Sequence, residues 1–208
     1  MTESVTLYPG IGTDEAIAEL HNLVGQITAT WAGVEDGLFI LFVVALTGSF
    51  VGQEIGPYRA VFFTFSSYEG KMRMVNNAMN ARYGEDEAVI AEWRDLRRAI
   101  DDFAHLRNEV AHLVPTPKSS STDPTAKANV RLVPPAWRSS LREFDFDSLG
   151  YSADELWQAL APYWGYHPRI SLNPPGGQAN YQLGYRLHQF ALTLEQPAFS
   201  PKGDPSSP

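Results

Sequence analysis

The stretch WRDLRRAIDDFAHLRNEVAHLV, residues 93–114, decides the fold that the sequence predicts. Its apolar residues recur at alternating steps of three and four, which is the spacing of one buried face of an α-helix. Arg107 stands where this spacing predicts an apolar residue, four residues after Phe103 and three before Val110. A cation in an apolar seam has to be paired or to extend out of it, because desolvating a charge costs on the order of several kcal/mol. The helix therefore carries a feature that packing alone does not explain.

Two polar residues follow this cation. Asn108 lies four residues before His112, so the amide and the imidazole are expected on one helix face. This order of arginine, amide and histidine indicates a functional site. Structural interpretations stay open: Arg107 can extend its charge to solvent or form a buried ion pair with Glu35 or Asp36, and His112 suits the C-terminal dipole of a helix.

The composition excludes several classes of protein. A chain of 208 residues with 44% hydrophobic and 19% charged residues is typical of a globular protein, with one well-packed domain or two small ones. The absence of cysteine excludes disulfides, thiolate nucleophiles and cysteine-based zinc sites. A net charge of -8 argues against a surface that is basic throughout, although a local basic groove stays compatible with it.

Four arginines cluster in the same helix, and these could form such a groove. They are Arg94, Arg97, Arg98 and Arg107. The alternative is a solvated face, because Arg97 and Arg98 each precede an aspartate, Asp101 and Asp102, by four residues.

The N-terminal residues lack the basic and apolar segments of a signal peptide. The most apolar window, residues 38–46, is far shorter than the roughly 20 residues that a membrane span needs. We therefore expect a cytoplasmic protein with no membrane association.

The periodicity predicts an all-α fold, an up-and-down bundle of four to five helices with an irregular insertion before the fourth helix. A single domain is expected over residues 13–194, after a lead-in at 1–12 and before a disordered tail at 195–208. Helices are expected over residues 13–46, 57–83, 85–113 and 180–194, and one starts after Ser152, where Glu155 completes a capping box and Pro162 breaks or kinks the helix. Residues 115–150 form the flexible insertion, with a short strand at 129–133.

Several residues within these helices carry their own predictions. Gly25, Gly33 and Gly37 lower the helix propensity of the first helix, and close packing of a neighbouring helix would account for them. Lys71 and Arg73 are expected on a solvated face.

Metal and cofactor chemistry has little support in the sequence. It contains no phosphate-binding glycine loop and no zinc-protease or serine-hydrolase motif. Asp101, His105, Asn108 and His112 form a polar stripe, but His105 and His112 lie about 10 Å apart along a helix, too far to share one metal ion. No cofactor and no metal are expected.

The segment Arg107-Asn108-x-x-x-His112 resembles the Arg-x4-6-His motif of the HEPN superfamily. The resemblance covers roughly residues 14–114, including Trp31 and Glu35 in the first helix and Lys71 in the second. It implies an all-α bundle that forms a homodimer with two motifs across a shared cleft. Many members of this superfamily are metal-independent endoribonucleases.

The resemblance implies cleavage of single-stranded RNA. His112 would transfer a proton to or from the reacting oxygens, Arg107 would neutralise the phosphate in the transition state, and Asn108 would hold the imidazole or the phosphate. Trp137 or Tyr151 could stack on bases, although core packing is the alternative role of both.

The sequence also departs from the family. Val114 stands where toxin-type members have a tyrosine, and the acidic balance does not favour RNA affinity. The alternative function is therefore a non-catalytic dimerisation or interaction module with a protein partner, such as an antitoxin.

Overall fold

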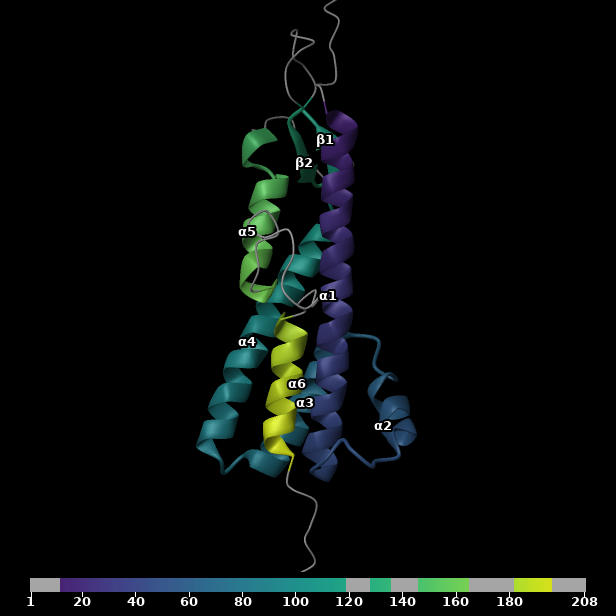
Figure 1. Cartoon of the computed structure of the whole chain (residues 1–208), viewed down its shortest axis with the longest axis vertical. Coiled ribbons are helices and arrows are strands. Elements are labelled where there is room, and N and C mark those ends of the chain that lie inside the picture. Colours follow the sequence, from purple (N-terminus) through teal and green to yellow (C-terminus); the bar gives the residue numbers. More distant parts are fainter. Residues whose placement is uncertain (1–11, 119–127, 136–145, 165–181, 196–208) are drawn as a thin grey trace, which may run out of the picture. The chain divides into compact units, whose positions relative to one another are not determined.

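The structure is a computed structural model, and it describes residues 12–118, 128–135, 146–164 and 182–195. These residues are mostly helical, which confirms the all-α class (Figure 1). The elements are α1 (Thr13–Thr47), α2 (Ile55–Phe62), α3 (Tyr68–Tyr83), α4 (Glu87–Val110), β1 (Val114–Pro117), β2 (Val130–Val133), a 3-10 helix (Phe146–Ser148), α5 (Ala153–Trp164) and α6 (Gln182–Leu194). Trp137 and most of the predicted lead-in, insertion and tail lie outside the described residues.

The single helix predicted over residues 57–83 is wrong, and the described residues hold six helices instead of four to five. α2 ends at Phe62, and α3 begins only after Ser67. The backbone N–H of Gly70 donates to the Ser67 hydroxyl, which caps α3 and replaces a helical bond. The chain therefore turns between two helices where the apolar spacing alone predicts one.

The end of the third predicted helix and the start of the insertion also differ from expectation. α4 ends at Val110, and not near residue 113, because Val114–Pro117 pairs as β1 with β2 in an antiparallel sheet. The expected strand near residues 129–133 is confirmed as β2. The sheet makes the described part of the insertion regular.

The predictions for the last two helices agree well with the structure. Ser152 and Glu155 form the expected capping box, in which each side chain accepts the backbone N–H of the other residue. α5 nevertheless continues past Pro162 to Trp164. α6 occupies the predicted range.

The contacts divide the chain into two compact units, defined here as unit one (Met1–Trp31 and Asp102–Ala179) and unit two (Ala32–Asp101 and Asn180–Pro208). Both α1 and α4 contribute a segment to each unit. The single domain over residues 13–194 stays a prediction.

Unit two contains a close approach between α1 and α6, and glycines make it possible. A Cβ atom on Gly37 would lie 2.8 Å from the Cβ of Leu187, and one on Gly184 would lie 2.7 Å from the carbonyl oxygen of Gly33. Such distances leave no room for a methyl group. The expectation of close helix packing is confirmed for Gly33 and Gly37, whereas Gly25 has nothing within 4 Å of a Cβ position.

Among the described residues, α1 is long and apolar enough to cross a membrane. Core helices of soluble proteins meet the same criterion, and 61% of its most apolar 18-residue window is buried within the structure.

The two kinds of glycine in α1 give a matched pair of substitutions. We expect Gly37→Ala to destabilise the protein by about 1–3 kcal/mol, because the added methyl group overpacks the contact with α6. Gly25→Ala should instead stabilise it by about 0.5–1 kcal/mol, because alanine is the better helix former and meets no neighbour. Urea unfolding of both variants measures the difference. Equal effects in the two variants would show that α6 does not pack closely on Gly37 in solution.

Candidate functional site

Arg107 lies in the last turn of α4, in unit one, and its side chain packs against an aromatic ring. Its guanidinium carbon is 4.5 Å from the ring centroid of Trp31, a residue of α1 that is buried. The face of an indole ring carries partial negative charge, so this cation–π contact stabilises the guanidinium without a carboxylate. Within the part of the chain that the structure describes, Arg107 has no ion pair.

One polar atom of Arg107 is left without a partner. Its Nε is buried and makes no hydrogen bond with the described residues. A buried donor without an acceptor costs roughly 1–3 kcal/mol, and this arrangement does not recover that cost. Among the described residues, the charge of Arg107 is therefore held against the Trp31 ring and has no neutralising group.

The aromatic support beneath Arg107 extends through unit one. The Phe103 ring lies 6.1 Å from the Trp31 ring and 4.7 Å from the ring of Tyr163, which comes from α5. Burial raises the pKa of Tyr163, and the charge of Asp102 adds to the rise. These rings connect α1, α4 and α5 within unit one, and Trp31 is the one that contacts the arginine.

His112 and Asn108 are both exposed, and neither side chain makes a hydrogen bond with the described residues. His112 lies beyond the end of α4, in a turn where its backbone N–H donates to the carbonyl of Glu109 at 3.1 Å. The prediction that Asn108 and His112 share one helix face is therefore wrong, because the helix ends before the histidine. The structure brings Arg107 and Trp31 together, while the imidazole and the amide stay open to solvent.

Glu109, inside the same motif, has a partner that the sequence did not indicate. The hydroxyl of Tyr151 donates to its carboxylate at 2.8 Å. Tyr151 is itself fixed, because its backbone exchanges two hydrogen bonds with Leu132 of β2. Tyr151 thus connects the end of α4 to the sheet through hydrogen bonds.

Glu35 pairs with Lys71 in unit two, where Nζ to Oε1 is 3.0 Å. The prediction that Lys71 is solvated is wrong, because its side chain is only 7% exposed. The Lys71 ammonium also lies 4.9 Å from the ring centroid of Phe63. Asp36, the other expected partner of Arg107, is exposed.

The remaining polar residues of α4 form local pairs. Asp101 accepts a hydrogen bond from the Tyr68 hydroxyl and pairs with Arg97 at 3.7 Å, as the spacing predicts. Arg98 pairs with Asp95 at 3.3 Å, and not with Asp102 as expected. No group of three or more histidine, aspartate or glutamate side chains suited to a metal occurs among the residues that the structure describes.

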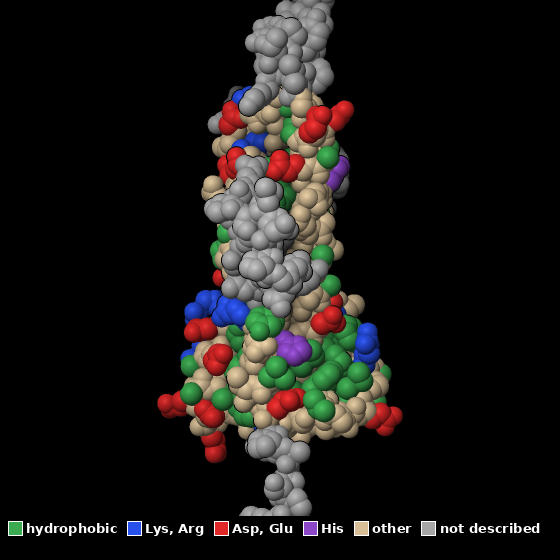
Figure 2. All heavy atoms as spheres, viewed as in Figure 1, with side chains coloured by type: hydrophobic (Ala, Val, Ile, Leu, Met, Phe, Trp, Pro, Cys, Tyr) green, Lys and Arg blue, Asp and Glu red, His purple; other side chains and the backbone are tan. Residues whose placement is uncertain are grey.

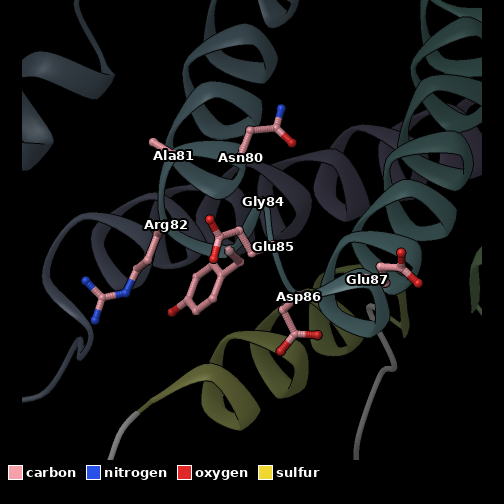
Figure 3. A pocket seen from close by; sticks show the side chains of 8 residues that line it. Asn80, Ala81, Arg82, Gly84, Glu85, Asp86 and Glu87 are labelled. Atoms are coloured by element: carbon pink, nitrogen blue, oxygen red, sulfur yellow. The ribbon is translucent and has the colours of Figure 1, made fainter.

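A pocket of about 1010 Å³ lies at the connection between α3 and α4 (Figure 3). One of its acidic residues has a structural role: the Asp86 carboxylate accepts the N–H groups of Ala88 and Val89 and so caps α4. Arg82 extends away from Asp86 in Figure 3. Its guanidinium lies close to Gly48, because a Cβ atom on Gly48 would be 2.5 Å from Nη2 of Arg82. The eight residues that line this pocket therefore do not form a catalytic arrangement that we can identify.

Comparisons with protein-family models, with curated proteins and with solved structures found no match for this chain. The assignment of a function therefore depends on the residues themselves.

The Tyr151–Glu109 contact predicts a pH dependence. Burial raises the pKa of Tyr151 to about 12, and the hydrogen bond to the Glu109 carboxylate adds to the rise. A raised folded-state pKa stabilises the protein fully below the unfolded value of roughly 10, and the contribution is lost as the pH rises through the folded value. We expect Glu109→Gln to lower the pKa of Tyr151, measured by NMR titration of labelled tyrosine.

Tyr163 is the internal control in this titration, because its raised pKa comes from burial and Asp102. Its resonance should titrate alike in both proteins. A Tyr151 resonance that does not move in the variant would show that the hydrogen bond is absent in solution.

The buried ion pair predicts a double-mutant cycle. We expect Glu35→Leu to destabilise the protein by about 2–3 kcal/mol, because it leaves Lys71 buried and unpaired. This is less than the roughly 3–5 kcal/mol of a fully buried pair, because the Glu35 side chain is 28% exposed. Adding Lys71→Met should recover most of the loss. Chemical unfolding measures both. The exposed pair Arg98–Asp95 is the control, where Asp95→Ala should cost less than about 1 kcal/mol; additive losses at Glu35 and Lys71 would contradict the pairing.

Proposed function

We propose that this chain is a HEPN-like, metal-independent endoribonuclease that cleaves single-stranded RNA. The observation that carries the proposal is the environment of Arg107: a partly buried guanidinium is held over Trp31 with no carboxylate partner among the described residues. An unneutralised, planar cation of this kind suits a phosphate, because its N–H groups form a fork that matches two phosphate oxygens.

His112 supplies the second requirement. It follows Arg107 by five residues, is exposed, and has no competing hydrogen bond among the described residues. In the proposed reaction the 2′-oxygen attacks the adjacent phosphorus and the 5′-oxygen leaves, so a 2′,3′-cyclic phosphate and a free 5′-hydroxyl form. His112 transfers a proton to or from these oxygens, and Arg107 stabilises the charge that develops on the phosphate.

Asn108 has the supporting role in this proposal. Its exposed amide can donate to a phosphate oxygen of the bound strand. The reaction needs no metal ion, because the guanidinium supplies the positive charge. We also propose a cytoplasmic homodimer in which two such motifs face a common cleft.

The alternative is a non-catalytic interaction module with a protein partner of the antitoxin type. The observation that favours it is the apolar surface of unit two. All the exposed large hydrophobic residues that the structure describes except Val114 belong to this unit, namely Leu46, Val51, Val61, Phe63, Phe65, Tyr185 and Leu192. Figure 2 shows hydrophobic side chains gathered beside α6 and over the C-terminal part of α1. Such surfaces are typical of sites where proteins associate.

The test is cleavage of a mixed single-stranded RNA in excess EDTA. We expect the wild-type protein to leave 2′,3′-cyclic phosphate ends and His112→Ala to lose about 100- to 10,000-fold in rate. His105→Ala is the matched control, because His105 is an exposed histidine of α4 that lies outside the motif. Equal cleavage by wild type and His112→Ala would remove His112 from the site, and no cleavage by either would favour the interaction module.

Arg107→Met completes the same experiment. The methionine keeps an apolar stem against Trp31, so the melting temperature should change little: the cation–π contact contributes about 0.5–2 kcal/mol, and the buried Nε that has no acceptor among the described residues is removed with it. Cleavage should nevertheless be lost. A large loss of stability together with unchanged cleavage would assign Arg107 a structural role.

A further inference from the structure

Unit two contains a groove that the proposed reaction does not use. It has a volume of about 490 Å³ and lies between the C-terminal part of α1 and the middle of α3. This volume is within the range of roughly 300–1,000 Å³ that is usual for small-molecule sites. All of its lining residues belong to unit two.

The walls of the groove are apolar and incompletely covered. Phe42 and Leu46 line it from α1, and Met74 and Ala78 line it from α3. Leu46 is 48% exposed, and Phe65, which also lines the groove, is 46% exposed. Large hydrophobic side chains that are exposed around a concavity are more typical of a binding site than of an ordinary solvated surface.

Gly70 explains how the Phe65 ring reaches the groove. A Cβ atom on Gly70 would lie 2.9 Å from Cδ1 of Phe65. Glycine at this position therefore lets the aromatic ring pack directly against the first turn of α3. The ring forms part of the apolar wall because of this contact.

Two polar side chains complete the lining, and neither has a partner in the part of the chain that the structure describes. Arg73 and Asn77 are four residues apart on α3, so they lie on the same face of the helix. Both are exposed, and neither makes an ion pair or a side-chain hydrogen bond with the described residues. A guanidinium fork beside an amide N–H donor is complementary to a carboxylate.

We propose that this groove binds a small amphiphilic carboxylate. Its alkyl chain lies along Phe42, Leu46 and Met74, and its carboxylate meets Arg73 and Asn77. A free small molecule fits better than a protein surface, because a stable protein interface engages about 20–30 residues on each side, and only eight residues line this groove. The proposal is independent of the ribonuclease activity.

Decanoate is the probe, titrated below its micelle concentration into the full chain by isothermal calorimetry. We expect saturable binding of one decanoate. Arg73→Gln should weaken it about ten-fold or more, because a charge-assisted hydrogen bond is lost. Arg94→Gln is the matched control, since Arg94 is an exposed arginine of unit two without an ion pair among the described residues, and it should bind as the wild type does.

Further arms of the experiment separate the chemistry and the source of the ligand. Leu46→Ser should also weaken decanoate binding, because it removes apolar contact area at an exposed position where folding is not at risk; circular dichroism of each variant verifies this. Decyltrimethylammonium has the same chain and the opposite charge, and it should bind much more weakly. Equal binding of both amphiphiles, or an unchanged affinity in Arg73→Gln, would overturn the proposal. Binding to anionic phospholipid vesicles without binding of decanoate would overturn it as well, in favour of a membrane surface.

Discussion

A permanent positive charge in the apolar seam of α4 is the constraint on which the packing of unit one depends. Arginine keeps its charge at any pH at which the protein folds, so proton loss cannot relieve the cost of burying it. The relief comes from the face of Trp31, 4.5 Å away, and from partial exposure of the side chain. The Trp31 ring that the guanidinium contacts is itself packed against Phe103, and the Phe103 ring lies against Tyr163.

In unit two, the cost of burying a charge is offset in a different way. Lys71 is more deeply buried than Arg107, and there a carboxylate is present, Glu35, with an aromatic ring beside the ammonium. The ion pair cancels the charge of the lysine, so this residue has a structural role. Of these two cations, Arg107 is the one that has no carboxylate partner among the described residues.

The sequence predicts those parts of the fold that depend on local order. The apolar rhythm of α1 and α4, the capping box of Ser152 and the range of α6 are set by neighbours within a few turns, and each was confirmed. The break between α2 and α3 was missed because no glycine or proline interrupts residues 58–69. The Ser67 side chain, which caps α3, was the available signal.

Tertiary contacts explain the other differences. The burial of Lys71 depends on Glu35, which is 36 residues away in the sequence, and propensity cannot indicate such a partner. The same holds for the candidate site. Arg107 and His112 could be identified because one interrupts the apolar rhythm and the other follows at a recognisable spacing. Trp31 continues the rhythm of its own helix, so its contact with the guanidinium had no signal in the sequence beyond its apolar character.

Stability alone does not account for an arginine at position 107. A leucine there would complete the seam that runs from Trp93 to Val110, and it would remove a buried Nε that has no acceptor among the described residues. Replacing buried charged groups by apolar ones of similar volume is often neutral or stabilising. The guanidinium is therefore kept at a cost to the folded state. An anion that binds there would supply the missing acceptor and the missing negative charge together, which is the physical argument for a phosphate ligand at this end of α4.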